Sequence, residues 1–338
     1  MTLACIFGCA GPALTPWEIA FFRDVRPWGF ILFGRNVESP GQVRALTEAL
    51  RETIGVAEAP ILIDQEGGRV QRLGPPHWRR YPPGRSYGLA SANDPLTRRE
   101  LARLGARMIA HDLNGLGINV DCAPVVDVPT RGAHDVIGDR AYATEPGEVA
   151  YLARAVAEGL IAGGVLPVIK HIPGHGRAGA DSHLALPVVD ASLADLEARD
   201  FAPFRQLSDM PIAMTAHVVY AAVDGRRPAT TSPRVIDQII REWIGFDGLL
   251  ISDDLSMKAL KGGLRSRAER SLTAGCDVLL HCNGGASEMK AVAAGASELV
   301  GEAARRAAAA LARLPRAVEP FDPALAAARL SGVFGEAA

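Results

Sequence analysis

One short segment rich in glycine and proline gathers more reactive side chains than any other part of the chain. Residues 170–176 read Lys-His-Ile-Pro-Gly-His-Gly, and Asp181, Ser182 and His183 follow shortly afterwards. Proline and glycine interrupt a regular helix, so these polar groups are expected on a shaped loop. The preceding residues 165–169 form an apolar, largely β-branched run that is typical of a buried strand. The segment is therefore a candidate site at the end of a strand.

A metal site is one interpretation of such a histidine cluster, and a polar surface turn is another. The spacing of His171 and His175 lacks the H-E-x-x-H pattern of zinc hydrolases. Pro173 and Gly174 lie between them and would break the helix that this pattern needs. We therefore expect neither a metal nor a cofactor.

A second candidate site lies where an apolar strand runs directly into two acidic residues. Residues 249–257 read Leu-Leu-Ile-Ser-Asp-Asp-Leu-Ser-Met. Burying a carboxylate without a partner is costly, so this pair should have a use. Side chains alternate along a strand, so Asp253 and Asp254 cannot both point the same way, and one could turn back to cap the next helix. Asp253 is the candidate for chemistry.

Composition describes an ordinary soluble globular protein. The chain has 338 residues, of which 48% are hydrophobic and 22% charged, and its formal net charge is -2. The sequence has no stripe of basic residues of the kind that binds nucleic acids. No linker rich in proline or serine and no charge run marks a domain boundary, so one large α/β domain is favoured over two smaller ones.

The sequence also lacks the signals of secretion and membrane insertion. Residues 1–7 have no positive region and too short an apolar run for a signal peptide, and no apolar run approaches the roughly 18 residues of a membrane span. We therefore expect a cytoplasmic protein. An odd number of cysteines in mostly apolar segments is typical of free thiols in a reducing compartment. These cysteines are Cys5, Cys9, Cys122, Cys276 and Cys282.

Apolar runs alternate with helical patterns along the chain. The runs end near Phe7, Phe33, Ile63, Val120, Ile169, Met214, Ile251 and Leu280. Among the helix starts between them, the clearest is a capping box with Thr15 before the helix and Glu18 three residues later. The others are a helix that begins at Ser39, one from Thr144 to about Gly163 and one from Ser192 to about Leu207.

Eight strands that alternate with helices predict a single (β/α)8 TIM-type barrel, because parallel neighbours need crossover connections. We assign residues 1–300 to this catalytic barrel and residues 301–338 to a C-terminal helical extension packed on it. A doubly wound open sheet is the alternative. It is disfavoured because no G-x-G-x-x-G turn follows the first run.

The positions of polar residues support a barrel, because barrel enzymes build their sites at the carboxyl ends of the strands. Six of the eight runs end in such residues. They are Asp64, Gln65 and Glu66 after the third run, Asp121 and Asp127 after the fourth, Lys170 and His171 after the fifth, His217 after the sixth, Asp253 after the seventh and Asn283 after the eighth.

Four sequence motifs resemble those of a known enzyme family. Residues 64–72 (DQEGGRVQR), 170–176 (KHIPGHG), 181–183 (DSH) and 252–257 (SDDLSM) stand in this order. Together they resemble the β-N-acetylhexosaminidases of glycoside hydrolase family 3, and within that family the short bacterial enzymes of cell-wall recycling. The resemblance runs from about residue 3 to residue 283.

This resemblance implies a role for individual residues. Asp253 would be the nucleophile that forms a covalent glycosyl-enzyme, and His183, paired with Asp181, would be the general acid/base. A neighbouring carboxylate favours the protonated form of a histidine, which suits this role. Alternatively, His183 merely anchors the turn. The residues implied in substrate binding are Asp64, Arg72, Arg140, Lys170 and His171.

Other interpretations of the charged residues stay open. Glu66 competes for the acid role, but it is more naturally a partner that holds the loop and Arg69 or Arg72 in place. Lys170 and Arg140 could belong to structural ion pairs rather than bind substrate.

The implied function is a retaining exo-β-N-acetylglucosaminidase that acts on terminal β-linked GlcNAc, with GlcNAc-1,6-anhydroMurNAc and its peptides as the expected substrates. We expect a monomer whose partner is this small-molecule substrate, with no nucleic acid and no membrane. A phosphorylase on the same fold and a β-glucosidase-like family 3 hydrolase are alternatives. A non-catalytic sugar-binding barrel is disfavoured because the Asp253 and His183 positions are both present.

Overall fold

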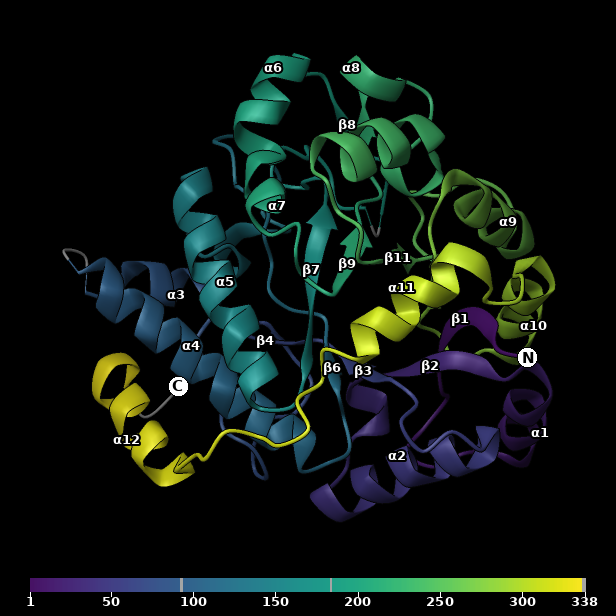
Figure 1. Ribbon diagram of the computed structural model, residues 1–338, viewed down its shortest axis with the longest axis horizontal. Helices are drawn as coiled ribbons and strands as arrows, with labels where there is room; N and C mark the ends of the chain where they lie inside the picture. The colour runs from purple at the N-terminus through teal and green to yellow at the C-terminus, as the bar shows by residue number, and fades with distance from the viewer. Residues whose placement is uncertain (92–93, 183, 336–338) are drawn as a thin grey trace.

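Eight parallel strands close into a barrel in the computed structural model of this protein, which describes residues 1–91, 94–182 and 184–335 (Figure 1). The strands follow one another around the barrel in chain order, and the last pairs with the first. The expected (β/α)8 barrel is confirmed, and the sheet is not open. The strands are β1 (Leu3–Gly8), β2 (Pro27–Leu32), β3 (Ile61–Ile63), β6 (Val120–Asp121), β7 (Leu166–Ile172), β9 (Ile212–Thr215), β11 (Leu249–Asp254) and β12 (Val278–His281).

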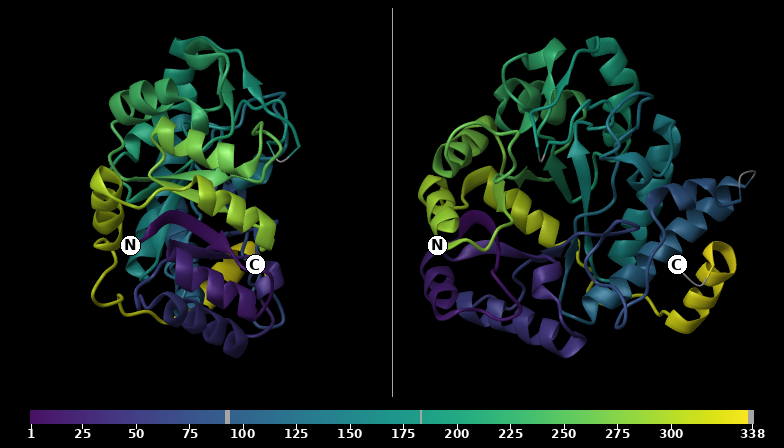
Figure 2. Two further views of the ribbon diagram at one scale, coloured as in Figure 1. Left: turned by 90° about the vertical axis from the view of Figure 1, so that its right-hand side faces the viewer. Right: turned by 180° about the vertical axis from the view of Figure 1, so that it is seen from behind.

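Helices surround the barrel on its outside (Figure 2). The connections between the strands carry α1 (Pro16–Val25), α2 (Pro40–Ile54), α3 (Gly84–Leu89), α4 (Pro95–Asn114), α5 (Pro146–Ala162), α6 (Leu193–Asp195), α7 (Ala202–Gln206), α8 (Ala221–Asp224), a π-helix (Val235–Trp243) and α9 (Leu264–Ala274). The helix α10 (Ala286–Gly295) follows the last strand, β12. Three single 3₁₀ turns are Gly34–Asn36, Gly138–Arg140 and Ala229–Thr231. No helix in the described part of the chain combines the length and the apolar character needed to cross a bilayer.

Two small sheets lie outside the barrel. An antiparallel hairpin joins β4 (Gln65–Gly67) to β5 (Val70–Gln71) directly after β3. A parallel pair joins β8 (Val188–Val189) to β10 (Val219–Tyr220). Both sit in connections that leave the carboxyl ends of barrel strands, so they shape the face on which a site is expected.

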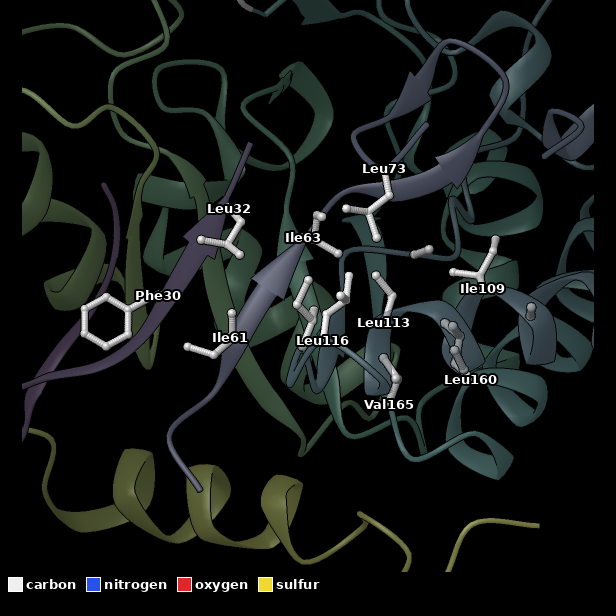
Figure 3. Close-up of a cluster of buried hydrophobic side chains, with 14 of the residues drawn as sticks. Phe30, Leu32, Ile61, Ile63, Leu73, Ile109, Leu113, Leu116, Leu160 and Val165 are labelled. Atoms are coloured by element: carbon white, nitrogen blue, oxygen red, sulfur yellow. The ribbon is translucent and has the colours of Figure 1, made fainter. Parts of the chain in front are cut away.

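Alternation along the strands divides the apolar side chains between two cores. Ile61 and Ile63 of β3 face outward and pack in a buried cluster with Leu113 and Leu116 of the α4 region (Figure 3). Leu62, between them, belongs instead to the cluster inside the barrel. This period of two is the side-chain pattern of a strand with both faces buried.

The two C-terminal helices pack at different places. Ala307 and Ala310 of α11 (Gly301–Leu311) join the cluster inside the barrel, so α11 covers its amino-terminal end. The following helix, α12 (Pro323–Phe334), lies beside α4 (Figure 1), where Arg329 Nη2 is 2.6 Å from Glu100 Oε2.

Three of the four expected helix starts are confirmed, those at Thr15, Ser39 and Ser192. Thr15 Oγ1 accepts a hydrogen bond of 3.2 Å from Glu18 N, and Glu18 Oε2 accepts one of 2.8 Å from Thr15 N, so the capping box is complete. Ser39 Oγ accepts from Gln42 N at 3.3 Å. These reciprocal bonds satisfy amides that have no partner within the helix.

The expected cap at Thr144 is wrong. The helix α5 begins at Pro146 after Glu145, whose side chain makes no capping hydrogen bond. Proline has no backbone N–H and is favoured at the first helical position, so it sets the start two residues later.

The continuous helix expected from Ser192 to about Leu207 is also wrong, although its start is right. Ser192 Oγ accepts from Asp195 N at 3.1 Å, but α6 gives way to a π-helical turn (Leu196–Asp200) before α7. Pro203 lies in the first turn of α7. A proline inside the helix would remove a backbone donor, so a new helix starts there.

Candidate active site

The carboxyl ends of the strands surround a pocket of about 370 Å³. Its wall is built by residues at or after the ends of β2, β3, β6, β7, β11 and β12, as the strand-end pattern of the sequence indicated. Of the residues implied in catalysis or binding, the pocket is lined by Asp64, Arg72, Arg140, Lys170, His171 and Asp253.

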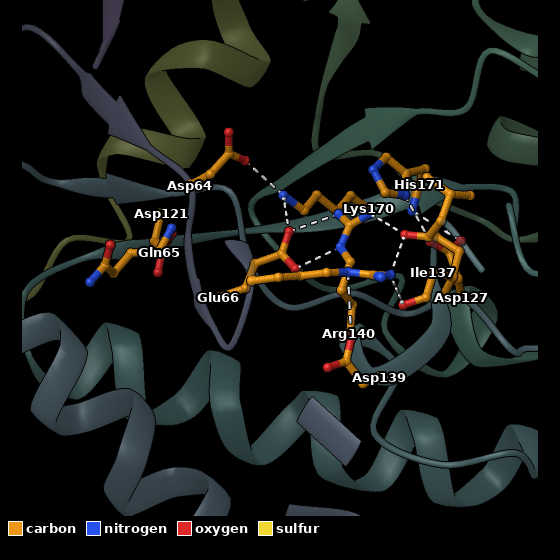
Figure 4. A network of polar contacts seen from close by, with 12 residues as sticks. Asp64, Gln65, Glu66, Asp121, Asp127, Ile137, Asp139, Arg140, Lys170 and His171 are labelled. Carbon is orange, nitrogen blue, oxygen red and sulfur yellow. Dashed lines mark hydrogen bonds and ion pairs between the residues drawn. The ribbon is translucent and has the colours of Figure 1, made fainter. Parts of the chain in front are cut away.

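A buried ion-pair cluster forms one side of this pocket (Figure 4). Lys170 Nζ lies 2.8 Å from Asp64 Oδ1 and 2.7 Å from Glu66 Oε1. Arg140 contacts both oxygens of Glu66, with Nη2 2.8 Å from Oε1 and Nε 2.9 Å from Oε2. Arg72 Nη2 lies 3.0 Å from Asp64 Oδ2. Each of these charges therefore has a partner of opposite sign, which buried charges require.

The expected partner of Glu66 needs correction. Glu66 pairs with Arg140 and Lys170 rather than with Arg69 or Arg72. Arg69 stands on the turn between β4 and β5, where 43% of its side chain is exposed, and pairs with Asp135 at 3.3 Å. At the tip of the hairpin Arg69 contacts Asp135 and Val136, so a residue near Glu66 in the sequence does not meet it in space.

Mutual stabilisation keeps this cluster ionised. Burial raises the pKa of Glu66, but the charges of Lys170 and Arg140 outweigh it and lower that pKa to about 2. The pKa of Asp64 is lowered as well, because Lys170 and Arg72 outweigh its burial. Burial lowers the pKa of Lys170, yet Asp64 and Glu66 raise it above its ordinary value. At neutral pH the pocket thus offers fixed charges to a polar ligand.

The carboxylate of Asp127 holds the loop of His171 and His175 through hydrogen bonds. Its Oδ2 lies 2.7 Å from His171 Nδ1, and its Oδ1 accepts hydrogen bonds from His171 N at 3.2 Å and His175 N at 2.6 Å. The pKa of Asp127 is lowered, because the charge and hydrogen bond of His171 outweigh its burial. A carboxylate at Nδ1 leaves Nε2 as the ring nitrogen of His171 that is available to a ligand.

The second histidine of the loop has a different environment. His175 is 3% exposed, and its Nε2 lies 3.3 Å from Ser182 Oγ. Burial, with a contribution from His171, lowers the pKa of His175 to about 4. His175 is therefore neutral at physiological pH, and the sequence motif by itself did not distinguish it from His171.

The two adjacent acidic residues of β11 both line the pocket but have different hydrogen-bond partners. Asp253 lines the pocket, and its Oδ1 accepts from Asp254 N at 2.7 Å. Asp254 Oδ1 accepts from Ser256 N and Cys282 N, both at 3.1 Å. Asp254 turns back as expected, but it caps a turn and joins β11 to the end of β12, because no helix follows directly.

Besides Glu66 and Asp127, three of the strand-end polar residues do not line the pocket in the described structure. Asp121 Oδ1 accepts from Gln65 N at 3.0 Å, and the side-chain amide of Gln65 donates to Leu73 O at 3.0 Å. The third, His217, is completely buried between Thr230 Oγ1 at 2.7 Å and Asp254 O at 3.0 Å. These residues hold loops in place.

The structure describes only one member of the expected acid/base pair of His183 and Asp181. His183 lies outside the described residues. Its expected partner Asp181 is half-buried, and its carbonyl oxygen accepts from Leu184 N and Ala185 N, both at 2.9 Å. Asp181 does not line the pocket among the described residues, whereas the next residue, Ser182, does.

Several pocket residues were not predicted as site residues, although Met257 among them belongs to the motif at residues 252–257. They include Phe33 and Arg35 after β2, Met214 at the end of β9, Met257 after β11 and Cys282 after β12. The strand-end rule could have found them if it had been applied to every residue type. In the described part of the chain, no group of three or more His, Cys, Asp or Glu side chains is arranged to hold a metal ion.

Comparisons with known proteins agree with this geometry. Residues 26–316 match the glycosyl hydrolase family 3 N terminal domain. A beta-hexosaminidase from Bordetella avium is 40% identical over 280 residues, which cover 81% of this chain and 79% of that protein. NagZ from Neisseria gonorrhoeae, in complex with N-trifluoroacetyl-D-glucosamine, superimposes with a TM-score of 0.87 and 34% identity over 99% of this chain and 98% of its own.

A longer relative shares the same fold. The family 3 beta-N-acetylglucosaminidase from Paenibacillus sp. str. FPU-7 has a TM-score of 0.84 and 29% identity over 97% of this chain, which spans 66% of that enzyme. The chain belongs to glycosyl hydrolase family 3 and is a glycoside hydrolase of the β-hexosaminidase type.

Proposed function

We propose that the protein is a retaining exo-β-N-acetylglucosaminidase that releases terminal β-linked GlcNAc through a covalent glycosyl-enzyme. The observation that carries this proposal is the position of Asp253 at the end of β11, in one pocket with the ionised cluster of Asp64, Arg72 and Lys170. A retaining glycosidase needs a carboxylate beside the anomeric carbon and groups that hold the sugar in register with it.

Asp253 is the proposed nucleophile. It is 6% exposed, so little water competes with the sugar for its carboxylate. Asp254 is the other carboxylate of β11, but its Oδ1 accepts from the amides of Ser256 and Cys282 and its Oδ2 accepts from the hydroxyl of Ser256. These bonds make it a structural group, which favours Asp253 for attack on the anomeric carbon.

His183, with Asp181 as its partner, is the proposed general acid/base. Glu66 is unsuited to that role, because a carboxyl with a pKa of about 2 that is held by Arg140 and Lys170 stays ionised and cannot donate a proton. His175 is unsuited as well, because its pKa of about 4 keeps it deprotonated at neutral pH.

Sugar recognition is assigned to five preorganised side chains. Charged donors and acceptors held in fixed geometry can bond hydroxyl and acetamido groups without first losing conformational freedom. The proposed set is Asp64, Arg72, Arg140, Lys170 and His171, all of which line the pocket.

The proposed natural substrates are GlcNAc-1,6-anhydroMurNAc and its peptides, cleaved by a monomeric enzyme during peptidoglycan recycling in the cytoplasm. The likeness to NagZ from Neisseria gonorrhoeae over nearly the whole length of both chains supports this choice.

Product analysis tests the proposal. Mass spectrometry after incubation with GlcNAc-β-1,4-anhydroMurNAc should give free GlcNAc, both with and without phosphate. Proton NMR at early times should detect the β-anomer first. A GlcNAc 1-phosphate product would instead identify a phosphorylase, and an α-anomer would contradict the retaining mechanism.

A second test addresses the acid role of His183. An acid is needed only for a poor leaving group, so His183→Ala should lose far more kcat/KM on the disaccharide than on an aryl glycoside with an acidic phenol. Equal losses on the two substrates would contradict the role.

A further inference from the structure

The arginines that line the pocket differ in how their charges are compensated. Arg72 pairs with Asp64, and Arg140 pairs with both oxygens of Glu66. Arg35 forms no ion pair with any described carboxylate. A guanidinium is always charged at physiological pH, so Arg35 brings an uncompensated positive charge to the pocket.

Arg35 is nevertheless held in one place. Its Nε donates to Cys9 O at 2.9 Å and its Nη2 to Cys282 O at 2.5 Å, so it is anchored to the loops after β1 and β12. Carbonyl oxygens fix the group without neutralising it. The anchoring also removes most of the conformational entropy that a mobile arginine would lose on binding a ligand.

An aromatic ring supports this charge. The Cζ atom of Arg35 lies 5.0 Å from the centroid of Phe33, and that of Arg72 lies 5.3 Å from the same centroid. The face of an aromatic ring attracts a cation through its quadrupole but carries no formal charge that would neutralise it. Phe33 thus carries two guanidinium groups on the β2 side of the pocket, one neutralised by Asp64 and one not.

The pocket has a buried end and an exposed end. Lys170 is 2% exposed and lies deep among its carboxylates, whereas Arg35 is an exposed residue. An exo-acting enzyme holds the terminal sugar at the closed end and leaves the rest of the substrate toward solvent. Arg35 therefore belongs to the end that faces the leaving group.

We propose that Arg35, supported by Phe33, is a specificity-determining residue that binds a carboxylate of the aglycone. This inference rests on the proposed function and deepens it, because it assigns recognition of the anionic leaving group to one side chain. Two sources of that carboxylate exist in muropeptides, the lactyl group of anhydroMurNAc and the stem peptide. A guanidinium binds either one through charge-assisted hydrogen bonds.

Three substrates with the same disaccharide separate these sources. The first is GlcNAc-anhydroMurNAc with a free lactyl carboxylate, the second is its lactyl methyl ester, and the third carries a stem peptide, so that only the peptide is anionic. The wild-type enzyme should have a kcat/KM about tenfold higher for the acid than for the ester. If the peptide is the source, the third substrate should show this preference instead.

Substitution should remove the preference. Arg35→Met should bring the ratio of kcat/KM between the anionic substrate and the ester close to one, and Arg35→Lys should restore part of it. Arg69→Met is the matched control, because it removes the same charge from an exposed arginine that already pairs with Asp135 and Asp139. Its ratio should equal that of the wild type.

A measurement on the wild-type enzyme covers the case in which Arg35→Met does not fold. Raising the ionic strength should raise KM for the anionic substrate and leave KM for the ester unchanged, because salt screens an exposed charge. The inference is wrong if the wild type does not distinguish either anion from the ester, if salt affects all substrates equally, or if Arg35→Met keeps the ratio. Failure to cleave any β-GlcNAc glycoside would overturn the proposed function instead.

Discussion

His217 Nε2 lies 3.0 Å from the carbonyl oxygen of Asp254, the residue that follows the proposed nucleophile in the chain. A carbonyl can only accept a hydrogen bond, so Nε2 carries the ring proton of His217 and Nδ1 is an acceptor. Thr230 Oγ1 lies 2.7 Å from Nδ1 and is therefore its donor. The tautomer of this buried histidine thus follows from its two partners.

The same chain of hydrogen bonds also reaches the backbone N–H of Asp253. Thr230 Oγ1 lies 2.8 Å from Thr215 Oγ1, which accepts from Asp253 N at 3.4 Å. The backbone N–H of Asp253 and the backbone C=O of Asp254 are therefore tied to one buried network. We expect this network to set the position of the Asp253 carboxylate.

Breaking this network should slow catalysis. Thr230→Val keeps the shape of the side chain but leaves His217 Nδ1 without its donor. An unsatisfied buried group costs about 1–3 kcal/mol of unfolding free energy, and misplacement of the nucleophile should lower kcat about tenfold with little change in KM. Steady-state kinetics and urea unfolding measure both effects.

Thr231→Val is the matched control for that variant. Thr231 is the adjacent residue, similarly buried, but its Oγ1 has only a 3.5 Å contact with Pro228 O. It should keep a kcat close to that of the wild type. Equal losses of kcat in the two variants would show that His217 does not position Asp253.

Removing the charge of the nucleophile should abolish turnover. Asp253→Asn keeps the shape of the side chain, so kcat should fall by several orders of magnitude, while inhibitor binding measured by calorimetry survives. Asp254→Asn should mainly lower stability, because Asp254 accepts hydrogen bonds from Ser256 N and Cys282 N. Near-normal turnover by Asp253→Asn would show that another residue is the nucleophile, with Asp254 the first alternative.

The buried lysine should be a major source of stability. Lys170→Met leaves Asp64 and Glu66 without their shared ammonium partner. Loss of one member of a buried ion-pair cluster costs about 3–5 kcal/mol of unfolding free energy. Arg69→Met, which breaks an exposed pair, should cost less than about 1 kcal/mol. Urea unfolding at pH 7 compares the two variants, and similar costs would contradict this account of the cluster.

His175 should make the protein sensitive to acid. Its pKa is lowered from 6.5 to about 4 in the folded state, so the neutral form is favoured by folding. The stability that depends on neutral His175 is complete above about pH 6.5 and is lost as the pH falls toward 4. His175→Gln cannot titrate, so its unfolding free energy should fall less than that of the wild type over this interval, by about 3 kcal/mol. Parallel pH profiles in urea unfolding would contradict the prediction.

The strands of the barrel were predictable because their signals are local. The run from residue 249 to 251 and its counterparts are apolar on both faces, which only a strand covered by helices and closed around an interior core can accommodate. Where helix predictions failed, a proline decided the boundary: Pro146 set the start of α5, and Pro203 began α7 after a π-helical turn.

The pocket followed in part from the same local information. Asp64, Lys170 and Asp253 each end a strand, and parallel strands of a barrel bring their carboxyl ends to one face. For this reason the residue types at the strand ends were enough to predict that these side chains meet. The role of His183 stays a prediction, because that residue lies outside the described part of the chain.

Local sequence patterns thus determined the barrel and the face that carries the site, because hydrophobic periodicity and strand-end position act over a few residues. Tertiary structure alone decided the partners of the charges. Glu66 meets Arg140, 74 residues away, rather than the nearby Arg69. His217, which also follows a strand, lies beneath the pocket and not in it. Such contacts depend on how distant loops fold back over the barrel, and the spacing of residues along the chain does not specify that path.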